Sequence, residues 1–434
     1  MPPAAERKER ALSCARGEAA PLSGDAFAAL IAPLGPFGAA PRLAVAVSGG
    51  ADSLALALLA DAWARARGGT IVAIIIDHGL RLESAAEAAL TAARLTGRGI
   101  PSEIIRLTGL APGPGLAARA REARFDALIQ AADAAGAAHL LLGHHAGDQA
   151  ETLLMRALAA SGPAGLAGMA GWRLAAGGGA ALLRPLLSVP PARLRATLRA
   201  AKLGWVEDPS NTDRRTLRAR LRPLAAVPAR RAGLLAAAAA RSTDRAAQNA
   251  EIAAILAERV ALYPEGYALL TPGPIAPAAL GAVLRLLGGR PYPPSTRAIA
   301  ALSAAPRPAT LAGVRLMPAG RHGEGRFAGG FLLVRETSAL APAIAARPGA
   351  LWDGRFRLGA SPSWADGANL GALGPLARRQ FPGARHLPAA VLAGLPALRL
   401  AQTLIVPHLL WPEPALAARF PVIFAPLAPA SEQN

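Results

Sequence analysis

Cysteine is nearly absent from this chain of 434 residues, because Cys14 is its single example. One thiol cannot form an intrachain disulfide, a thiolate metal cluster or a redox pair of cysteines. The first residues mix acidic and basic side chains and lead into no continuous apolar core of the signal-peptide type. We therefore expect a cytoplasmic protein, with a leader and an N-terminal helix over residues 1–39.

Long uninterrupted hydrophobic runs are also lacking. The stretch 266–284 is uncharged and long enough to cross a bilayer, but it contains Pro272, Pro274 and Pro277 together with Gly273 and Gly281. Proline removes a backbone donor and disrupts the helix that a membrane span would need. We predict that this stretch belongs to a soluble domain and that the protein has no membrane partner.

Lysine and acidic residues are scarce relative to arginine. Asp and Glu number 28 against 47 for Lys and Arg, which gives a formal net charge of +19, and the two lysines are Lys8 and Lys202. This excess predicts salt-sensitive attraction to polyanions, with nucleic acid as the leading partner. Arginine suits bidentate phosphate contacts and base stacking. Biased codon usage is an alternative reason for arginine in place of lysine, but it does not explain the surplus of charge.

The most informative segment is a glycine turn, SGGADS at residues 48–53, between an apolar run and a helical pattern that begins at Leu54. Adjacent glycines let backbone N–H groups face an anion, and the two serines and a helix N-terminus add donors. A carboxylate there, Asp52, is expected to hold a metal ion, position a nucleophile or cap the helix. The turn lacks the lysine of a Walker motif and the third glycine of a dinucleotide fingerprint.

From residue 43 onward, short apolar runs alternate with segments whose apolar residues recur at helical spacing. The expected strands cover residues 43–47, 70–76, 102–107, 139–142 and, with a weaker pattern, 181–186. The expected helices cover residues 54–67, 83–97, 116–134 and 148–159. This alternation predicts an α/β fold with a doubly wound, mostly parallel sheet that binds ligands at the carboxyl ends of its strands.

Polar clusters follow the second and the fourth of these strands, as DHGLR at residues 77–81 and GHHAGDQAET at residues 143–152. His144, Asp148 and Glu151 are expected to share one face of a helix, because offsets of three and four residues meet there. Local alternatives are that Asp77 caps the next element and that Asp148 and Glu151 form a capping box. Nothing else in the sequence completes a zinc site, so we favour substrate and magnesium-nucleotide chemistry.

Arginines gather in two further segments. Arg119, Arg121 and Arg124 lie near the start of an expected helix, an unfavourable place for cations unless they face an anion such as phosphate. Five more follow the segment WVEDPSN and lie within residues 214–222, a loop that could cover the site and hold RNA backbone. A solvated surface is the alternative for both groups.

Beyond Pro223 the pattern changes to an Ala-rich helix over residues 230–259 that carries several arginines, either a basic module or a solvated surface helix. A Pro-rich linker is expected next, followed by short strands within residues 310–336 and 351–358. The sequence thus predicts a nucleotide-binding domain at 40–225, a helical domain at 226–290 and a small α+β region at 291–434.

SGGADS resembles the SGGxDS signature of the PP-loop ATP pyrophosphatases, which cleave ATP to AMP and pyrophosphate while adenylating a substrate. In order, SGGADS, DHGLR, AREARF, LGHHAGDQAET and WVEDPSN are similar to the tRNA(Ile)-lysidine synthetase family over residues 40–222. The resemblance implies ATP- and Mg²⁺-dependent ligation of free L-lysine to the wobble cytidine of the CAU-anticodon isoleucine tRNA. It also implies that the two C-terminal domains hold tRNA, as in the extended form of the family.

The same resemblance implies two sets of site residues. The nucleotide-binding set is Ser48, Gly49, Gly50, Ala51, Asp52, Ser53, Asp77 and His78. The catalytic set is Asp52, Asp148, Glu151, Arg124 and Arg218. The acids are expected to hold lysine or to take the proton from its amine, and which acid does which stays open, as do the metal ligands.

This chain departs from the family pattern at two places. Residues 218–222 read RARLR where the family has an Arg-Asn-x-Ile-Arg-like run, which shifts the match of Arg218 by up to a few positions. Phe125 stands where a tyrosine is usual, so the ring is kept and the hydroxyl is lost.

Three other function classes were weighed against this one. A tRNA thiolase needs cysteines for sulfur or an iron–sulfur cluster, and Cys14 alone argues against it. A glutamine-dependent amidating synthetase needs a glutaminase nucleophile, which is not visible. A non-catalytic RNA-binding protein that retains the ATP fold is expected to have lost Asp52, Asp148 or Glu151, and all three are present.

Overall fold

The computed structural model describes residues 19–79, 83–108, 113, 115–161, 163–174, 179–207, 217–290, 292–347, 349–359, 367–400, 403–405 and 422–424. Residues 1–18 of the expected leader, Leu80 and Arg81, and the loop 208–216 lie outside these ranges. The chain divides into two compact units, Met1–Ala175 with Gly179–Arg245, and Ala246–Gln433. The domain boundaries expected near residues 225 and 290 stay predictions.

The first unit contains a sheet with helices on both faces. Its helical elements are α2 (Gly24–Ile31), η1 (Ala32–Leu34), α3 (Ala51–Arg65), α4 (Ser84–Thr96), α5 (Leu116–Ala134), α6 (Ala146–Leu158), α7 (Pro163–Leu166), α8 (Pro191–Ala200) and α9 (Leu217–Ala226). Its strands are β1 (Arg42–Val47), β2 (Thr70–Asp77), β3 (Ser102–Arg106), β4 (His139–Leu141), β5 (Trp172–Leu174) and β6 (Ala181–Leu183). The strand order is β3-β2-β1-β4-β6-β5, with the first five strands parallel and β5 antiparallel.

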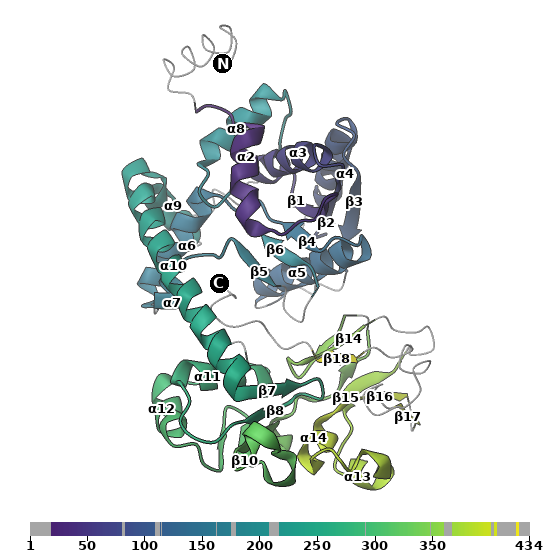
Figure 1. Cartoon of the computed structure of the whole chain (residues 1–434). Helices are drawn as coiled ribbons and strands as arrows, with labels where there is room; N and C mark the ends of the chain where they lie inside the picture. Colours follow the sequence, from purple (N-terminus) through teal and green to yellow (C-terminus); the bar gives the residue numbers. More distant parts are fainter. Residues whose placement is uncertain are drawn as a thin grey trace. The chain divides into compact units, whose positions relative to one another are not determined.

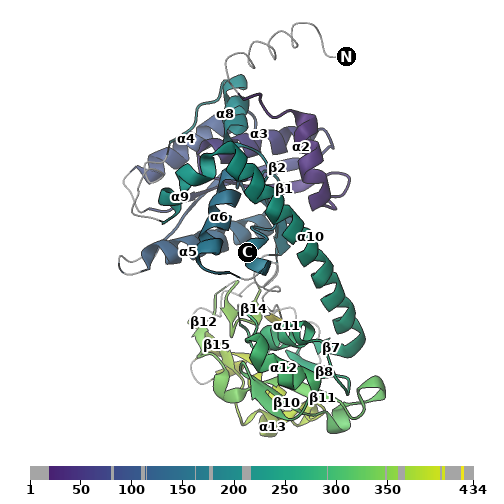
Figure 2. The same cartoon turned by 90° about the vertical axis from the view of Figure 1, so that its left-hand side faces the viewer.

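This sheet confirms the predicted doubly wound fold. Along β1, Leu43, Val45 and Val47 belong to the core packed under α3 and α8, whereas Ala44 belongs to the core packed under α5. Apolar side chains on both faces explain why the strand reads as a continuous apolar run. α3 and α4 lie on one side of the sheet and α5 on the other (Figures 1 and 2). β5 was not predicted, because its residues, Trp172–Leu174, are interrupted by Arg173 and form no apolar run.

Two helices begin earlier than the sequence predicted, α3 at Ala51 instead of Leu54 and α6 at Ala146 instead of Asp148. Apolar periodicity marks only the turns that pack on the sheet, whereas the polar first turn depends on its cap. Asp52 and Asp148 consequently both lie in first turns of helices. His144 precedes α6, so the prediction that it shares a helix face with Asp148 and Glu151 was wrong.

The second unit consists of small sheets and short helices. Its helical elements, with the preceding long helix, are α10 (Pro228–Arg259), α11 (Pro277–Leu287), α12 (Thr296–Ala304), η3 (Gly320–His322), η4 (Gly325–Phe327), η5 (Thr337–Ala339), α13 (Ala377–Gln380), η7 (Pro382–Ala384) and α14 (Ala389–Gly394). One sheet has the order β7 (Val260–Tyr263), β8 (Tyr267–Leu270), β11 (Phe331–Arg335), β10 (Val314–Pro318), β9 (Ala309–Leu311). The others are β12 (Ile344–Ala345), β15 (Asn369–Ala372), β16 (Pro396–Leu400), β17 (Thr403–Ile405) and β13 (Leu351–Trp352), β14 (Phe356–Leu358), β18 (Val422–Phe424).

The region after Arg259 was expected to be a Pro-rich linker, and this prediction was wrong. It forms β7, β8, α11 and α12. Pro277 is the first residue of α11, where its missing N–H would have no partner within the helix. Over the ranges that the structure describes, no helix has both the length and the apolar character to cross a membrane.

A buried charge cluster joins the small sheets of the second unit. Arg335 donates two hydrogen bonds to the Asp353 carboxylate, at 3.0 and 2.9 Å, and Arg355 donates a third at 2.8 Å. The Ala341 N–H donates to the same carboxylate at 3.0 Å. Asp353 has a φ of +53°, and burial lowers the pKa of Arg355 to about 10. One carboxylate thus neutralises part of the charge of two arginines that are almost completely buried.

We expect Asp353→Asn to lower the free energy of unfolding of the second unit by about 3 kcal/mol or more, because it leaves two buried cations without a counter-charge. Asn keeps the shape of the side chain and tolerates positive φ, so the variant isolates the charge. Denaturant unfolding of the full chain measures the loss, with exposed Glu324→Gln as the control. A midpoint equal to that of the control would contradict a stabilising role for this cluster.

Candidate active site

A cleft of about 510 Å³ opens at the carboxyl ends of β1, β2 and β4. A smaller cavity of about 180 Å³ shares part of its lining and extends between the sheet and α5. Residues that line both are Ser48, Gly50, Asp52, Ile76, His78, Arg124 and His144. The smaller cavity adds Val47, Ile74, Leu128 and Leu142, so it is the more apolar of the two.

The glycine turn is held in one conformation by its neighbours. Gly49 has a φ of +82°, and a Cβ atom there would lie 2.5 Å from the Thr91 hydroxyl oxygen. The Val206 N–H donates to the Gly49 carbonyl at 2.9 Å. The Ser53 hydroxyl donates to the Gly50 carbonyl at 3.1 Å and accepts from the Ser48 N–H at 3.1 Å. The first amides of α3 have no acceptor within the helix, so the turn presents preorganised donors to an anion.

The end of β4 lies directly against this turn. A Cβ atom at Gly143 would be 3.1 Å from both the Cα and the backbone nitrogen of Ser53. Such a contact is tighter than most real Cβ contacts, so a side chain here would require the backbone of α3 to shift by a few tenths of an ångström. The residues after Gly143, which lead into α6, are therefore brought beside the start of α3.

His145 connects the two helix starts. Its Nδ1 accepts hydrogen bonds from the Gly147 and Asp148 N–H groups, at 3.0 and 3.2 Å, and Asp148 Oδ2 accepts from the His145 N–H at 2.9 Å. Because Nδ1 is an acceptor, the proton of the neutral ring lies on Nε2, which is 3.5 Å from Asp52 Oδ2. The capping box is thus formed by His145 and Asp148, and Glu151 takes no part in it.

Asp52 and Asp148 differ in their protonation behaviour. Burial raises the pKa of Asp52, and the nearby Asp148 charge raises it further, although His145 and Arg195 oppose both effects. Burial also acts to raise the pKa of Asp148. The charge of His145, the hydrogen bond from the His145 N–H and the charge of Arg218 together outweigh burial, so the pKa of Asp148 is lowered. The Asp52 side chain is 35% exposed, yet its Oδ1 is covered and has no hydrogen-bond partner among the described residues.

Arg218 and Arg222 from α9 hold the acids of α6. Arg218 donates to Asp148 Oδ1 at 2.5 Å and to Glu151 Oε2 at 2.6 Å, and Arg222 donates to Glu151 Oε1 at 3.0 Å. The Glu151 side chain is only 4% exposed, whereas the two arginines are about two-fifths exposed. Burial alone would lower the pKa of Arg218, but its bonds to the two acids raise it. The predicted catalytic residues Asp148, Glu151 and Arg218 therefore form one network.

The remaining predicted residues differ in their positions. Arg124 lines both cavities and lies beside Phe125, and burial lowers its pKa. His78 also lines both cavities. Asp77 is buried, accepts a hydrogen bond from the Gly79 N–H at 2.9 Å and lines neither cavity. This hydrogen bond is local, as in the alternative that Asp77 caps the element that follows it. A part for Asp77 in nucleotide binding stays a prediction.

Two residues of the site were not predicted from the sequence. Arg195 on α8 lines the larger cleft and its charge reaches Asp52. No motif surrounds it, and only the packing of α8 beside α3 brings it there. The second residue is His145, whose side chain lies between Asp52 and Asp148. Among the described residues, no group of three or more His, Cys, Asp or Glu side chains has the arrangement of a metal site.

Comparisons with known proteins agree with this architecture. The model of the PP-loop domain (ATP_bind_3) matches residues 25–226. The tRNA(Ile)-lysidine synthase of Bradyrhizobium diazoefficiens is 51% identical over 43% of this chain, and the match covers 51% of that protein. Among solved structures, the U34-tRNA thiolase NcsA of Methanococcus maripaludis with its [4Fe-4S] cluster matches 49% of this chain and 76% of that chain, with a TM-score of 0.40 at 14% identity.

A longer match decides the family. The tRNA(Ile)-lysidine synthase of Ruegeria pomeroyi is 38% identical over 82% of this chain, and the match covers 86% of that protein. For several other relatives the match spans only about half of their length. The predicted relationship is thus confirmed by full-length similarity as well as by the glycine turn and the acids beside it: the chain belongs to the tRNA(Ile)-lysidine synthase family of PP-loop proteins.

Proposed function

We propose that this protein uses ATP to join free L-lysine to the wobble cytidine of the isoleucine tRNA with a CAU anticodon, in the cytoplasm. The observation that carries the proposal is the meeting of the glycine turn with Asp52 and Asp148 in one cleft, where Arg218, which also lines the cleft, joins Asp148 to the buried Glu151. A phosphate cradle beside paired carboxylates suits the adenylation of one substrate and the capture of an amine. The membership of the chain in the lysidine synthase family supports this assignment.

In the first step, the 2-carbonyl oxygen of cytosine attacks the α-phosphorus of ATP and pyrophosphate leaves. A new P–O bond forms as the bond to the β-phosphate bridging oxygen breaks, and negative charge grows on the leaving group. The amides at residues 50–53 and Arg124 are placed to stabilise that charge. The apolar cavity beside α5 is a suitable place for the adenine base.

The donors fit a magnesium ion at the polyphosphate. Asp52 has a covered oxygen without a protein partner, and Mg²⁺ is usually held by one or two carboxylates together with substrate phosphates. Asp52 would hold the ion, which when bound neutralises phosphate charge. Burial raises the pKa of Asp52, because a charged carboxylate is less stable away from water, and a bound cation would oppose this shift.

In the second step, the lysine amine attacks C2 of the adenylated cytosine. A C–N bond forms, the C2–O bond breaks, AMP leaves with that oxygen, and one proton is released from the amine. The ε-amine has a pKa of about 10.4 in water and is therefore mostly protonated at neutral pH. The lowered pKa of Asp148 keeps its carboxylate ionised. We propose that Asp148 and Glu151 hold the ammonium group of lysine when Arg218 shares or gives up its hydrogen bonds to these two acids.

The charge of the chain suits a tRNA partner. The formal net charge is +19, and along α10 Arg230 and Arg241 lie exposed and Arg231 lies partly exposed. Such a surface attracts the phosphate backbone without reading its sequence. We propose that residues 226–290 and 291–434 contribute to tRNA binding in this way.

We expect Asp52→Asn to lower tRNA-dependent pyrophosphate release on the order of a hundredfold or more, because it removes the charge from a group at the reacting phosphates. The dissociation constant for tRNA should stay within about twofold, since phosphate contacts elsewhere supply most of that affinity. Asp61→Asn, further along α3 and paired with Arg65, is the matched control and should release pyrophosphate normally. Turnover by Asp52→Asn at the rate of the control would contradict the proposed role.

We expect tRNA affinity to fall steeply as salt rises, because binding releases counterions from the phosphates. Filter binding from low to moderate salt gives the slope of log K against log salt. Replacing Arg231 by Gln should reduce that slope by about one if Arg231 contacts a phosphate. Arg65→Gln, which removes a cation already paired with Asp61, is the control. Affinity that does not change with salt would contradict a basic tRNA-binding surface.

A further inference from the structure

The carboxyl edge of the sheet continues beyond β4 to β6 and β5, and arginines lie there. Arg184 follows β6 directly, and Arg173 pairs with Leu182 across the β5–β6 ladder. Leu182 belongs to the core under α5, so Arg173 opposite it and Arg184 two residues later are expected on that same face. Arg121 comes from α5 itself. Three guanidinium groups from three elements are thus directed to one side of the sheet.

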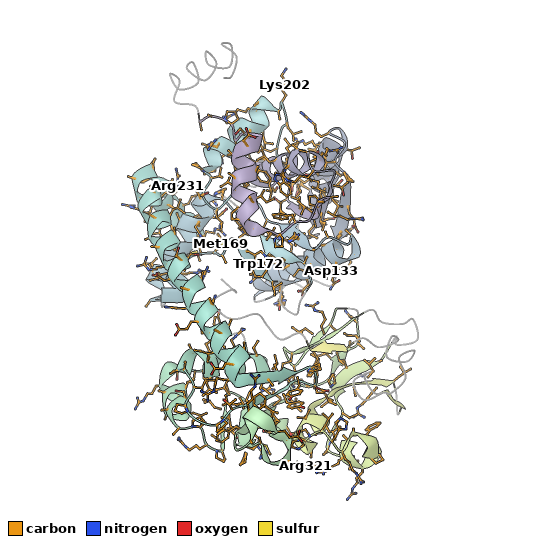
Figure 3. The ribbon with its side chains drawn as sticks, in the orientation of Figure 1. Asp133, Met169, Trp172, Lys202, Arg231 and Arg321 are labelled. Atoms are coloured by element: carbon orange, nitrogen blue, oxygen red, sulfur yellow. The ribbon has the colours of Figure 1, made fainter. Side chains whose placement is uncertain are left out.

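Arg184 is the innermost member of this group. It is 6% exposed, and its backbone N–H donates to the Gly171 carbonyl at 2.7 Å. Its Nη1 donates to the Ala170 carbonyl at 2.9 Å, whereas its buried Nε has no partner among the described residues. Met169 and Trp172, on either side of Ala170 and Gly171, are labelled in Figure 3. A buried guanidinium with an unused donor is costly unless an acceptor reaches it.

The charges around Arg184 are all positive. Burial lowers its pKa to about 9, and Arg173, Arg121 and Arg156 lower it further. No carboxylate pairs with Arg184 within the part of the chain that the structure describes. A structural arginine is usually buried with an acid, as Arg355 is with Asp353 in the second unit. The contrast indicates that the counter-charge at Arg184 comes from a ligand.

Arg121 is the member of this group that lines the cleft, together with His144 and Asp148, whereas Arg173 and Arg184 belong to the lining of neither cavity. Burial and the charge of Arg184 lower the pKa of His144 to about 3, so its ring is neutral and adds no charge of its own. The strand order places β6 two strands from β1, roughly 10 Å along the edge. The arginines therefore lie on the opposite side of β4 from the glycine turn, where ATP phosphates are proposed to bind.

We propose that Arg121, Arg173 and Arg184 form an anion subsite that holds the α-carboxylate of the amino-acid substrate. This inference rests on the proposed function and adds the group that recognises an amino acid rather than a simple amine. Asp148 and Glu151 lie on α6, which follows β4, and β4 lies between β1 and β6 in the sheet; this order suits a substrate with a carboxylate at one end and an ammonium group at the other. Guanidinium groups bind carboxylates with two parallel hydrogen bonds.

The test compares L-lysine with cadaverine, which has the same terminal amine and no carboxylate. Initial rates are measured on the CAU-anticodon isoleucine tRNA at saturating ATP, for the wild-type chain and for Arg184→Gln and Arg121→Gln. Arg119→Gln removes the same charge from α5 at a position outside the cleft lining and is the matched control. Because Arg184 also holds the Ala170 carbonyl, exposed Arg121 gives a variant whose folding is not in question.

We expect the wild-type chain and the Arg119→Gln control to prefer L-lysine over cadaverine in kcat/KM on the order of tenfold to a hundredfold. The Arg184→Gln and Arg121→Gln variants should lose most of this preference through a higher KM for L-lysine. A preference retained in both variants would overturn the proposal, and so would a parallel loss with both amines, which indicates a structural role. Weaker tRNA binding with the preference retained would instead assign the arginines to an RNA phosphate and would also overturn it.

The outcomes for the wild-type chain separate this inference from the proposed function. If the protein couples L-lysine and cadaverine to the tRNA equally well, the ligase function stands and the carboxylate subsite is wrong. If it couples neither, the proposed function is wrong and the subsite falls with it.

Discussion

The close approach of Gly143 to Ser53 is the constraint on which the site depends. A Cβ atom on residue 143 would lie 3.1 Å from the backbone at the start of α3, closer than most real Cβ contacts. Because glycine allows contact, the segment that follows β4 begins beside the phosphate-sized turn that follows β1. Two helices therefore start side by side, each with a carboxylate in its first turn. His145 lies between these carboxylates and fixes their separation.

Charge is distributed unevenly around this junction. Near the turn, Asp52 has a raised pKa and a covered oxygen that finds no partner among the described residues, a state that a cation would stabilise. On α6, Asp148 and Glu151 are already neutralised by Arg218 and Arg222 from α9. Beyond β4, Arg184 is buried among other arginines. The charge around the site thus changes from a place that favours a cation, through paired acids, to buried arginines, and this order suits the proposed reaction of a magnesium nucleotide with an amino acid.

The sequence predicted those parts of the structure that local rules determine. The parallel strands, α5 from Leu116 to Ala134 and the position of the glycine turn follow from apolar periodicity and turn chemistry. The first turns of α3 and α6 were missed, because a polar first turn has no periodicity. The elements after Arg259 were taken for a linker, since prolines in loops and at the first position of a helix look alike in sequence.

The site was predictable where motifs carry it and not where packing does. Asp52, Asp148 and Glu151 follow from motif order, and Arg218 was found despite an uncertain match in its loop. Arg195 lies in a segment without a motif, and it reaches the cleft through the packing of α8 beside α3. The link from Asp52 to Asp148 through His145 depends on a ring orientation that only three-dimensional contacts reveal.

We propose that the cleft transfers AMP to a nucleobase and that lysine then replaces the AMP. Incubation of the protein with labelled lysine, ATP and the CAU-anticodon isoleucine tRNA, followed by digestion to nucleosides, tests this reaction most directly. We expect lysine to appear on a single cytidine and AMP and pyrophosphate to form in equal amounts. Cleavage of ATP to ADP and phosphate, or lysine attached only at the 3′ end of the tRNA, would contradict it.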